Sequence, residues 1–118
     1  MSSEGEEKKR RPNSRHLTQW SAQFAVASEL CKLGYDVGFT MGHNTPLADL
    51  FVIAPDSKTT FLIDVKGQRT KNFWQIKAKQ DRSDLYYVLA YVPPGNPNRF
   101  FIMTQKQVNL RLDEYRNN

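Results

Sequence analysis

The sequence predicts an α/β fold, with a central mixed sheet of about five strands flanked by helices in the order α-β-β-β-α-β-β-α. Two observations lead to this prediction. A stretch near the N-terminus repeats its apolar residues with the period of an amphipathic helix. The rest of the chain contains short runs rich in Val, Ile, Phe and Tyr, bounded by turn residues, which is typical of buried strands. The chain of 118 residues has room for one modest domain, assigned here to residues 14–118.

The first helix is expected over Thr18–Leu33, with Gly34 as its C-terminal stop. At about 100° per residue, its apolar side chains fall within one broad arc, which should face the sheet. These residues are Trp20, Phe24, Val26, Ala27, Leu30, Cys31 and Leu33. Gln23 lies in the middle of this arc, whereas Glu29 lies outside it and should point to solvent.

Five strands should follow the helix. They are Tyr35–Met41, Ala48–Ala54, Phe61–Val65, Leu85–Val92 and Phe100–Met103. After the last of them, Thr104 and Gln107 have the spacing of a capping box, which predicts a final helix that runs to about Tyr115.

The second and third strands should form a hairpin, because only a four-residue turn separates them. Side chains alternate between the two faces of a strand, so Asp64 and Lys66 share one face. A turn of this length pairs Ala54 with Thr59, which in turn brings Asp49 opposite Asp64. A slip of one residue would put Asp49 on the wrong face. The sequence therefore predicts two carboxylates and one ammonium group together at one end of the sheet.

Two carboxylates this close repel each other and need a cation. A hard divalent ion such as Mg²⁺ suits them, since it is usually held by one or two carboxylates with waters and phosphate oxygens. The neighbouring Lys66 can orient a water or stabilise developing negative charge. The alternative interpretation of Asp49, Asp64 and Lys66 is a surface salt bridge at a strand end.

Pro46 and Asp49, followed after the hairpin by Asp64-Val65-Lys66, resemble the motif of the PD-(D/E)XK nuclease superfamily, which includes restriction endonucleases and Holliday-junction resolvases. The proline is two residues further from the first Asp than the name implies. The resemblance covers about residues 18–115 and implies a restriction-endonuclease-like core. It also implies that Asp49, Asp64 and the Val65 carbonyl hold Mg²⁺ or Mn²⁺, and that Lys66 positions or activates the attacking water.

The chain departs from this family on the first helix. Many members carry a glutamate eleven residues before the glycine that ends the helix, and here that position is Gln23. A neutral amide can coordinate a metal weakly or hold a water, but it supplies less charge. Gln23 is therefore a second-tier catalytic candidate, and its alternative role is a buried amide bonded to the sheet backbone. Gln68, just after the motif, is a candidate for positioning the scissile phosphate.

Basic residues gather between the third and fourth strands, where Asn72 can cap a short helix with Phe73 and Ile76 turned inward. Basic side chains contact phosphates and aromatic rings can stack on bases. The predicted nucleic-acid contacts here are Arg69, Lys71, Trp74, Lys77, Lys79 and Arg82. In the loop before the motif, His43 and Asn44 are further candidates, although a lone loop histidine is more often simply exposed.

Composition limits the class of protein. The net charge of +5 suits a polyanionic partner such as DNA. Residues 1–13 combine acidic and basic residues and should be a disordered basic tail, either an arm for phosphates or a solvated segment.

Cys31 is the only cysteine, which excludes an internal disulfide and a cysteine-rich zinc site. We found no membrane-spanning run, no signal peptide and no motif for a small-molecule cofactor, so a cytoplasmic protein is expected.

The sequence thus favours a metal-dependent endonuclease that hydrolyses DNA phosphodiester bonds. Two alternatives stay open. The missing helix carboxylate makes a non-catalytic nucleic-acid-binding module on the same fold plausible, and the basic face could instead serve a structural or regulatory nuclease subunit. One active site cuts one strand, so a homodimer is expected if both strands are cut.

Overall fold

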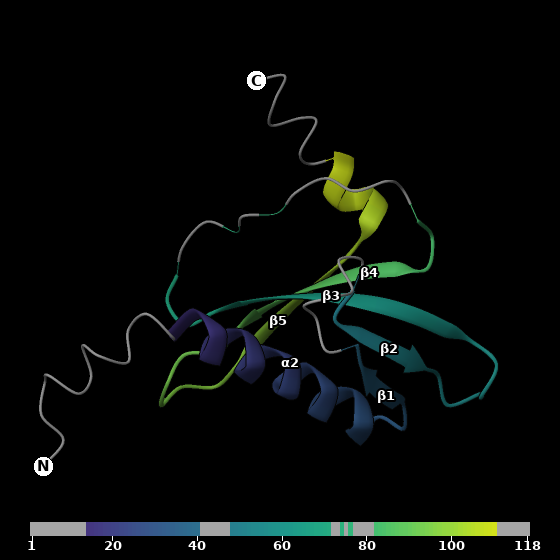
Figure 1. The fold of residues 1–118 in the computed structure, drawn as a ribbon, viewed down its shortest axis with the longest axis horizontal. Coiled ribbons are helices and arrows are strands. Elements are labelled where there is room, and N and C mark those ends of the chain that lie inside the picture. Colours follow the sequence, from purple (N-terminus) through teal and green to yellow (C-terminus); the bar gives the residue numbers. More distant parts are fainter. Residues whose placement is uncertain (1–13, 41–47, 72–73, 75, 77–81, 111–118) are drawn as a thin grey trace, which may run out of the picture.

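The computed structural model describes residues 14–40, 48–71, 74, 76 and 82–110 (Figure 1). It contains one long helix, α2, and a sheet of five strands, β1 to β5. Their bounds are α2 Ser14–Lys32, β1 Asp36–Phe39, β2 Leu50–Ile53, β3 Thr60–Gln68, β4 Leu85–Tyr91 and β5 Arg99–Thr104. Residues 105–110, after β5, are helical.

The strands form a single mixed sheet in the order β1-β2-β3-β4-β5. β3 and β4 run parallel, and the other neighbouring strands run antiparallel. The parallel pair needs a long crossover, which residues 69–84 supply. The predicted α/β class and the mixed sheet of five strands are therefore confirmed.

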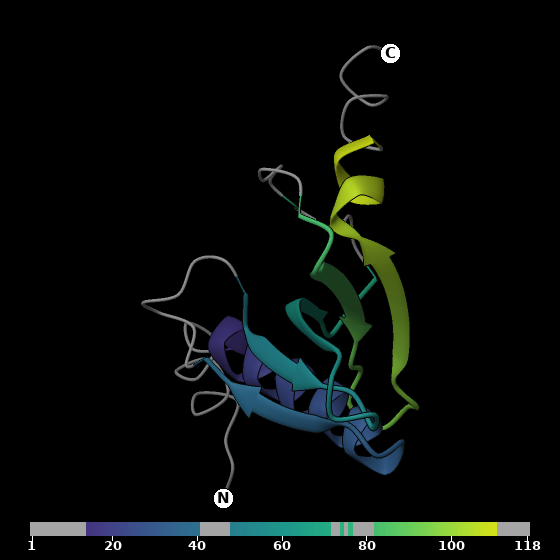
Figure 2. The ribbon, with the colours of Figure 1, turned by 90° about the vertical axis from the view of Figure 1, so that its right-hand side faces the viewer.

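Each face of the sheet is covered, and Figure 1 shows α2 and the helix of residues 105–110 on opposite sides of it. The face under α2, called the helix-covered face, buries one apolar cluster that includes Ala22, Val26, Ile63, Val65 and Val88. The opposite face buries a smaller cluster of Ala48, Leu85, Tyr87 and Val108, with Leu62, Ile76 and Met103 packed against it. Figure 2 shows the twist of the sheet between these two layers. Among the described residues, no helix is long and apolar enough to cross a membrane.

The rotation of α2 differs from the predicted arc. Ala22 and Val26 are buried, whereas the Phe24 and Leu33 side chains are 58% and 70% exposed. The reason is a close approach: a Cβ added at Gly67 of β3 would lie 2.6 Å from the Ala22 Cβ. The helix therefore lays its small residues on the sheet and leaves Phe24 at the side, with its ring 5.2 Å from that of Phe39.

The predicted helix between β3 and β4 is wrong at the two residues that can be inspected, because neither Trp74 nor Ile76 is helical. Ile76 does point inward as predicted, since it packs against the cluster on the opposite face. The proposed cap at Asn72 lies outside the described residues.

The C-terminal end of α2 and the N-terminal end of the helix after β5 carry the signals that the sequence predicts. Gly34 has a left-handed φ of 92°, and its N–H donates to the Cys31 carbonyl at 3.0 Å, which ends α2. The capping box after β5 is confirmed in both directions. The Thr104 N–H donates to Gln107 Oε1 at 2.8 Å, and the Gln107 N–H donates to Thr104 Oγ1 at 3.1 Å.

The turn Pro55–Lys58 is organised by Asp56. Its Oδ1 accepts the backbone N–H groups of Lys58 and Thr59, both at 2.8 Å, and its Oδ2 accepts the Thr59 hydroxyl at 2.8 Å. The hydrogen bond from the Thr59 backbone, followed by those from Lys58 and the Thr59 hydroxyl, lowers the pKa of Asp56 below its ordinary value of 3.8.

This turn gives a pH-dependent prediction. A carboxyl whose pKa is lower in the folded protein stabilises the fold above its unfolded pKa, and this contribution is lost as the pH falls through the folded value. Asp56→Ala should therefore lower the melting temperature at pH 7 by a few degrees, and the difference should vanish as the pH falls well below 3.8. Thermal melts of both proteins across this range measure it, and a difference that stays constant with pH would contradict the role of the charge.

Candidate metal and nucleic-acid site

The β2–β3 hairpin has the predicted register. Leu50 pairs with Ile63, which is the predicted register, and the pairing ends there, one residue short of Asp49 and Asp64. The Asp49 N–H donates to the Ile63 carbonyl at 2.9 Å. At the other end, the Ala54 N–H donates to the Thr59 carbonyl at 2.8 Å, which closes the predicted four-residue turn.

Strand β3 is longer than predicted, and this creates a fork in the sheet. It continues to Gln68 because it pairs with β4 as far as Tyr91, whereas β2 begins only at Leu50. The backbone of β3 beyond Ile63 therefore has no β2 residue beside it. Side chains take the place of that strand: Asp49 Oδ2 accepts the N–H of Val65 at 2.7 Å. This hydrogen bond fixes the Asp49 carboxylate at the fork.

A residue that the sequence analysis did not select, Gln19 of α2, bonds to the same edge of β3. Its Nε2 donates to the Val65 carbonyl at 2.7 Å, and its Oε1 accepts the Gly67 N–H at 3.3 Å. Gln19 precedes Gln23 by four residues and so lies on the same side of the helix. That spacing was the available sequence signal, but choosing between the two glutamines required knowing where α2 crosses β3.

Asp64 and Lys66 lie on the opposite face of the sheet from α2, next to each other along β3. The Lys66 Nζ lies 3.5 Å from Asp64 Oδ1. The Asp64 side chain is only 6% exposed, whereas that of Lys66 is 37% exposed. The carboxylate is therefore buried, whereas the ammonium group reaches solvent.

Tyr87 of β4 is the direct neighbour of Asp64 across the parallel pair. Burial, and then the negative charge of Asp64, raise the pKa of the Tyr87 phenol to about 12. The phenol therefore stays neutral at physiological pH. A neutral, fully buried ring limits the access of water to one side of Asp64.

Thr40, after β1, fixes the backbone that carries Asp49. Its hydroxyl donates to the Ala48 carbonyl at 2.7 Å, and its N–H donates to the Asp49 carbonyl at 2.9 Å. Together with the hydrogen bond from Val65, these contacts hold Asp49 from both neighbouring strands.

Asp64 and Lys66 are thus brought into contact, and Asp49 bonds to the residue between them, whereas Gln23 lies on the other side of the sheet. Gln23 belongs to α2, is only 6% exposed and lies on the helix-covered face. The side chains of Asp64 and Lys66 are on the opposite face. Gln68 shares the face of Lys66, is half-buried, and accepts the Val92 N–H through its backbone carbonyl at 2.7 Å.

The donor set of this fork fits a hard divalent ion. The Asp49 carboxylate is bonded to the backbone of β3 at Val65, next in the chain to Asp64, and Mg²⁺ is commonly held by one or two carboxylates, with waters in its other positions. Across the described ranges, no group of three or more His, Cys, Asp or Glu side chains could hold a metal. Any ion bound by Asp49 and Asp64 would therefore keep several exchangeable positions, which substrate oxygens can take.

The predicted nucleic-acid contacts fall into three groups. Arg69 and Lys71 are exposed and directly follow β3. Arg82 is exposed but already bonded to Asp84, with Nε to Oδ1 and Nη2 to Oδ2 both at 2.8 Å. This hydrogen-bonded pair raises the pKa of Arg82 and lowers that of Asp84, so the Arg82 charge is locally neutralised. Trp74 is half-buried, and His43, Asn44, Lys77 and Lys79 lie outside the described residues.

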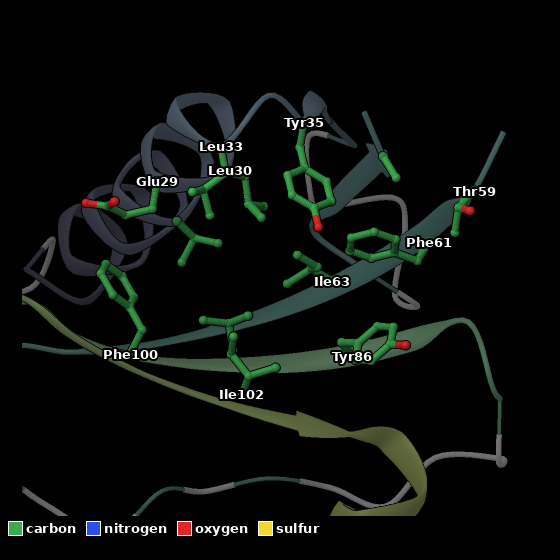
Figure 3. Close-up of a pocket in the computed structure, with 13 residues that line it drawn as sticks. Glu29, Leu30, Leu33, Tyr35, Thr59, Phe61, Ile63, Tyr86, Phe100 and Ile102 are labelled. Carbon is green, nitrogen blue, oxygen red and sulfur yellow. The ribbon is translucent and has the colours of Figure 1, made fainter. Parts of the chain in front are cut away.

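The structure also contains a cavity of about 720 Å³ away from this fork (Figure 3). It lies on the helix-covered face, where Leu30 of α2 and Leu33, just after this helix, face Phe100 and Ile102 of β5. Its lining is mostly apolar and includes one carboxylate, Glu29, which lies 3.5 Å from Lys32. Such a lining does not suit a phosphate group, and the sheet separates the cavity from Asp64.

Comparisons with models of protein families, with curated proteins and with solved structures found no match to this chain.

Proposed function

We propose that this protein is a metal-dependent endonuclease that hydrolyses phosphodiester bonds in DNA. The observation that supports it most is the fork between β2 and β3. There Asp64 lies 3.5 Å from Lys66, and the Asp49 carboxylate accepts the N–H of Val65, the residue between them, in the hairpin register predicted from the turn length. The net charge of +5 and the exposed Arg69 and Lys71 beyond the end of β3 favour a polyanionic substrate.

In this proposal, Asp49 and Asp64 hold Mg²⁺ or Mn²⁺ through carboxylate oxygens, and the Val65 carbonyl is a further ligand. A bound divalent ion supplies polarisation of the phosphoryl group. Lys66 donates N–H bonds to the attacking water or to a phosphoryl oxygen and stabilises the negative charge that develops there. Asp64, 3.5 Å from the Lys66 Nζ, holds that ammonium group in place. Gln68 shares the face of Lys66 and can hydrogen-bond the phosphate.

The position of Gln23 favours one alternative function. The third carboxylate of many family members is absent, and the amide in its place is buried on the other side of the sheet from Asp64. A chain with only two carboxylates at the fork would bind a divalent ion more weakly. Such a chain can serve as a DNA-binding module or a nuclease subunit without cutting by itself.

A supercoiled plasmid incubated with the protein and Mg²⁺, or with EDTA, separates these functions. The proposal predicts Mg²⁺-dependent nicking, with open circles formed before linear DNA because each chain carries one site. DNA binding without cleavage in either Mg²⁺ or Mn²⁺ would support the binding module. Neither binding nor cleavage would support the subunit.

The proposed contacts of DNA with Arg69 and Lys71, just after the end of β3, can be tested. Replacing both Arg69 and Lys71 with alanine should lower the slope of log affinity against log salt by about two units, roughly one for each phosphate that is no longer neutralised. Lys58→Ala is the matched control, because this exposed lysine lies in the turn before β3, at the opposite end of the strand. Equal slopes for the double variant and the control would contradict this path.

A further inference from the structure

Gln19 bonds to the two peptide groups that flank Lys66. Its amide N–H meets the Val65 carbonyl at 2.7 Å, and its amide oxygen meets the Gly67 N–H at 3.3 Å. A glutamine amide offers one donor side and one acceptor side, as a peptide group does. Gln19 therefore makes the hydrogen bonds that a neighbouring strand would make at this edge of β3. It makes one on each side of Lys66.

The alternation of β3 makes this contact matter for Lys66. Val65 and Gly67 present their backbone groups to the fork, while the Lys66 side chain projects from the opposite face beside Asp64. Two fixed peptide planes determine the direction of the Cα–Cβ bond between them. Without these hydrogen bonds the planes could rotate, and the Nζ at the end of a long side chain would move further than the backbone itself.

Val65 is held in two directions at once. Its N–H donates to Asp49 Oδ2 at 2.7 Å, and its carbonyl accepts the Gln19 Nε2. Asp49 and Gln19 therefore bond to two successive peptide groups that meet at the Val65 Cα, so their positions are linked through this one residue. Ala22, one turn further along α2, lies so close to Gly67 that the helix cannot slide along β3 without displacing it.

We propose that Gln19 is a positioning residue for the site, an inference that rests on the proposed function. Gln19 holds the Val65 carbonyl toward Asp49 and fixes Lys66 in the direction needed at the scissile phosphate. It acts on turnover rather than on DNA affinity, because its contacts are to the β3 backbone. Outer contacts of this kind typically change metal affinity or activity by about 10–100-fold.

The test compares Gln19→Met with Gln107→Met. Methionine is close in length to glutamine but cannot make either hydrogen bond. Gln107 also accepts a backbone N–H, that of Thr104 at 2.8 Å, but it lies in the helix after β5 and away from the fork. The inference predicts that Gln19→Met lowers kcat about 10–100-fold with KM changed less than about threefold, whereas Gln107→Met leaves both unchanged.

A second measurement needs no metal and no cleavage. Amide hydrogen exchange in the metal-free protein should show faster exchange at Gly67 in Gln19→Met, with Leu62 unchanged, because the Leu62 N–H bonds to the Asp84 carbonyl at 2.8 Å. Unprotected Gly67 in the wild-type protein would overturn the inference, even if Gln19→Met failed to fold. Gln19→Asn, one methylene shorter, can keep at most one of the two bonds and should also lower kcat.

The outcomes separate the two proposals. A wild-type protein that cleaves, together with a Gln19→Met variant of equal kcat, overturns the role of Gln19 and leaves the proposed function standing. Equal losses of kcat in Gln19→Met and Gln107→Met would mean that only overall stability changed, which also overturns it. A wild-type protein without Mg²⁺-dependent cleavage overturns the proposed function itself.

Discussion

Asp64→Asn is expected to abolish cleavage while DNA binding is retained or becomes tighter. The substitution keeps the size of the side chain but removes one of the two charges at the fork, and with it most of the affinity for a divalent ion. Loss of several kcal/mol of transition-state stabilisation corresponds to a fall in rate of roughly 10³-fold. DNA affinity should not fall, because the removed charge would repel phosphate.

The measurement is the rate of plasmid nicking at saturating Mg²⁺, beside DNA affinity at the same salt concentration. Asp36→Asn is the matched control, because this exposed residue begins β1 and pairs with Ile53, at the other end of β2 from Asp49. Cleavage by Asp64→Asn at the wild-type rate would show that Asp64 is not part of the site. A loss of both cleavage and thermal stability would point to a structural role in its place.

Gly67→Ala is expected to destabilise the protein by about 1–3 kcal/mol in the free energy of unfolding. The new Cβ would lie 2.6 Å from the Ala22 Cβ and 3.2 Å from the Thr18 carbonyl oxygen. Neither neighbour can turn away, since one is a methyl group fixed to the helix and the other is helix backbone. The helix must therefore move away from β3, which also takes Gln19 from its hydrogen bonds and lowers cleavage.

Urea unfolding of Gly67→Ala and Gly38→Ala measures this. Gly38 of β1 is the matched control, because a Cβ there would lie 4.0 Å from its nearest heavy neighbour, the Phe51 carbonyl oxygen. Combining Gly67→Ala with Ala22→Gly should cost less than the sum of the two single changes, since the closest contact is then removed. Strict additivity, or a Gly67→Ala protein as stable as Gly38→Ala, would contradict the close packing of α2 on β3.

The hairpin could be predicted from sequence because two independent constraints agree. Alternation along β3 puts Asp64 and Lys66 on one face, and the four-residue turn sets the register that brings Asp49 to β3, where it bonds to Val65. The local signals at Gly34 and in the capping box of Thr104 and Gln107 were equally readable, because each depends on residues close in the chain.

The rotation of α2 could not be predicted in the same way. Hydrophobic periodicity favours an arc through Phe24 and Leu33, but contact with β3 is decided by the smallest residues, Ala22 and Gly67. That contact is between positions far apart in the sequence. The position of Gln19 follows from it, whereas Gln23 was selected from the spacing in the family that the chain resembles. The length of β3 likewise depends on its pairing with β4.

Mn²⁺ titration followed by NMR tests the central claim, that Asp49 and Asp64 together bind a divalent ion. A paramagnetic ion broadens the signals of nearby amides, so the first signals to disappear should be those of Asp49 and of the residues around Lys66. Asp49→Asn and Asp64→Asn should each prevent this broadening. Broadening confined to other acidic residues, or wild-type broadening in both variants, would contradict the account.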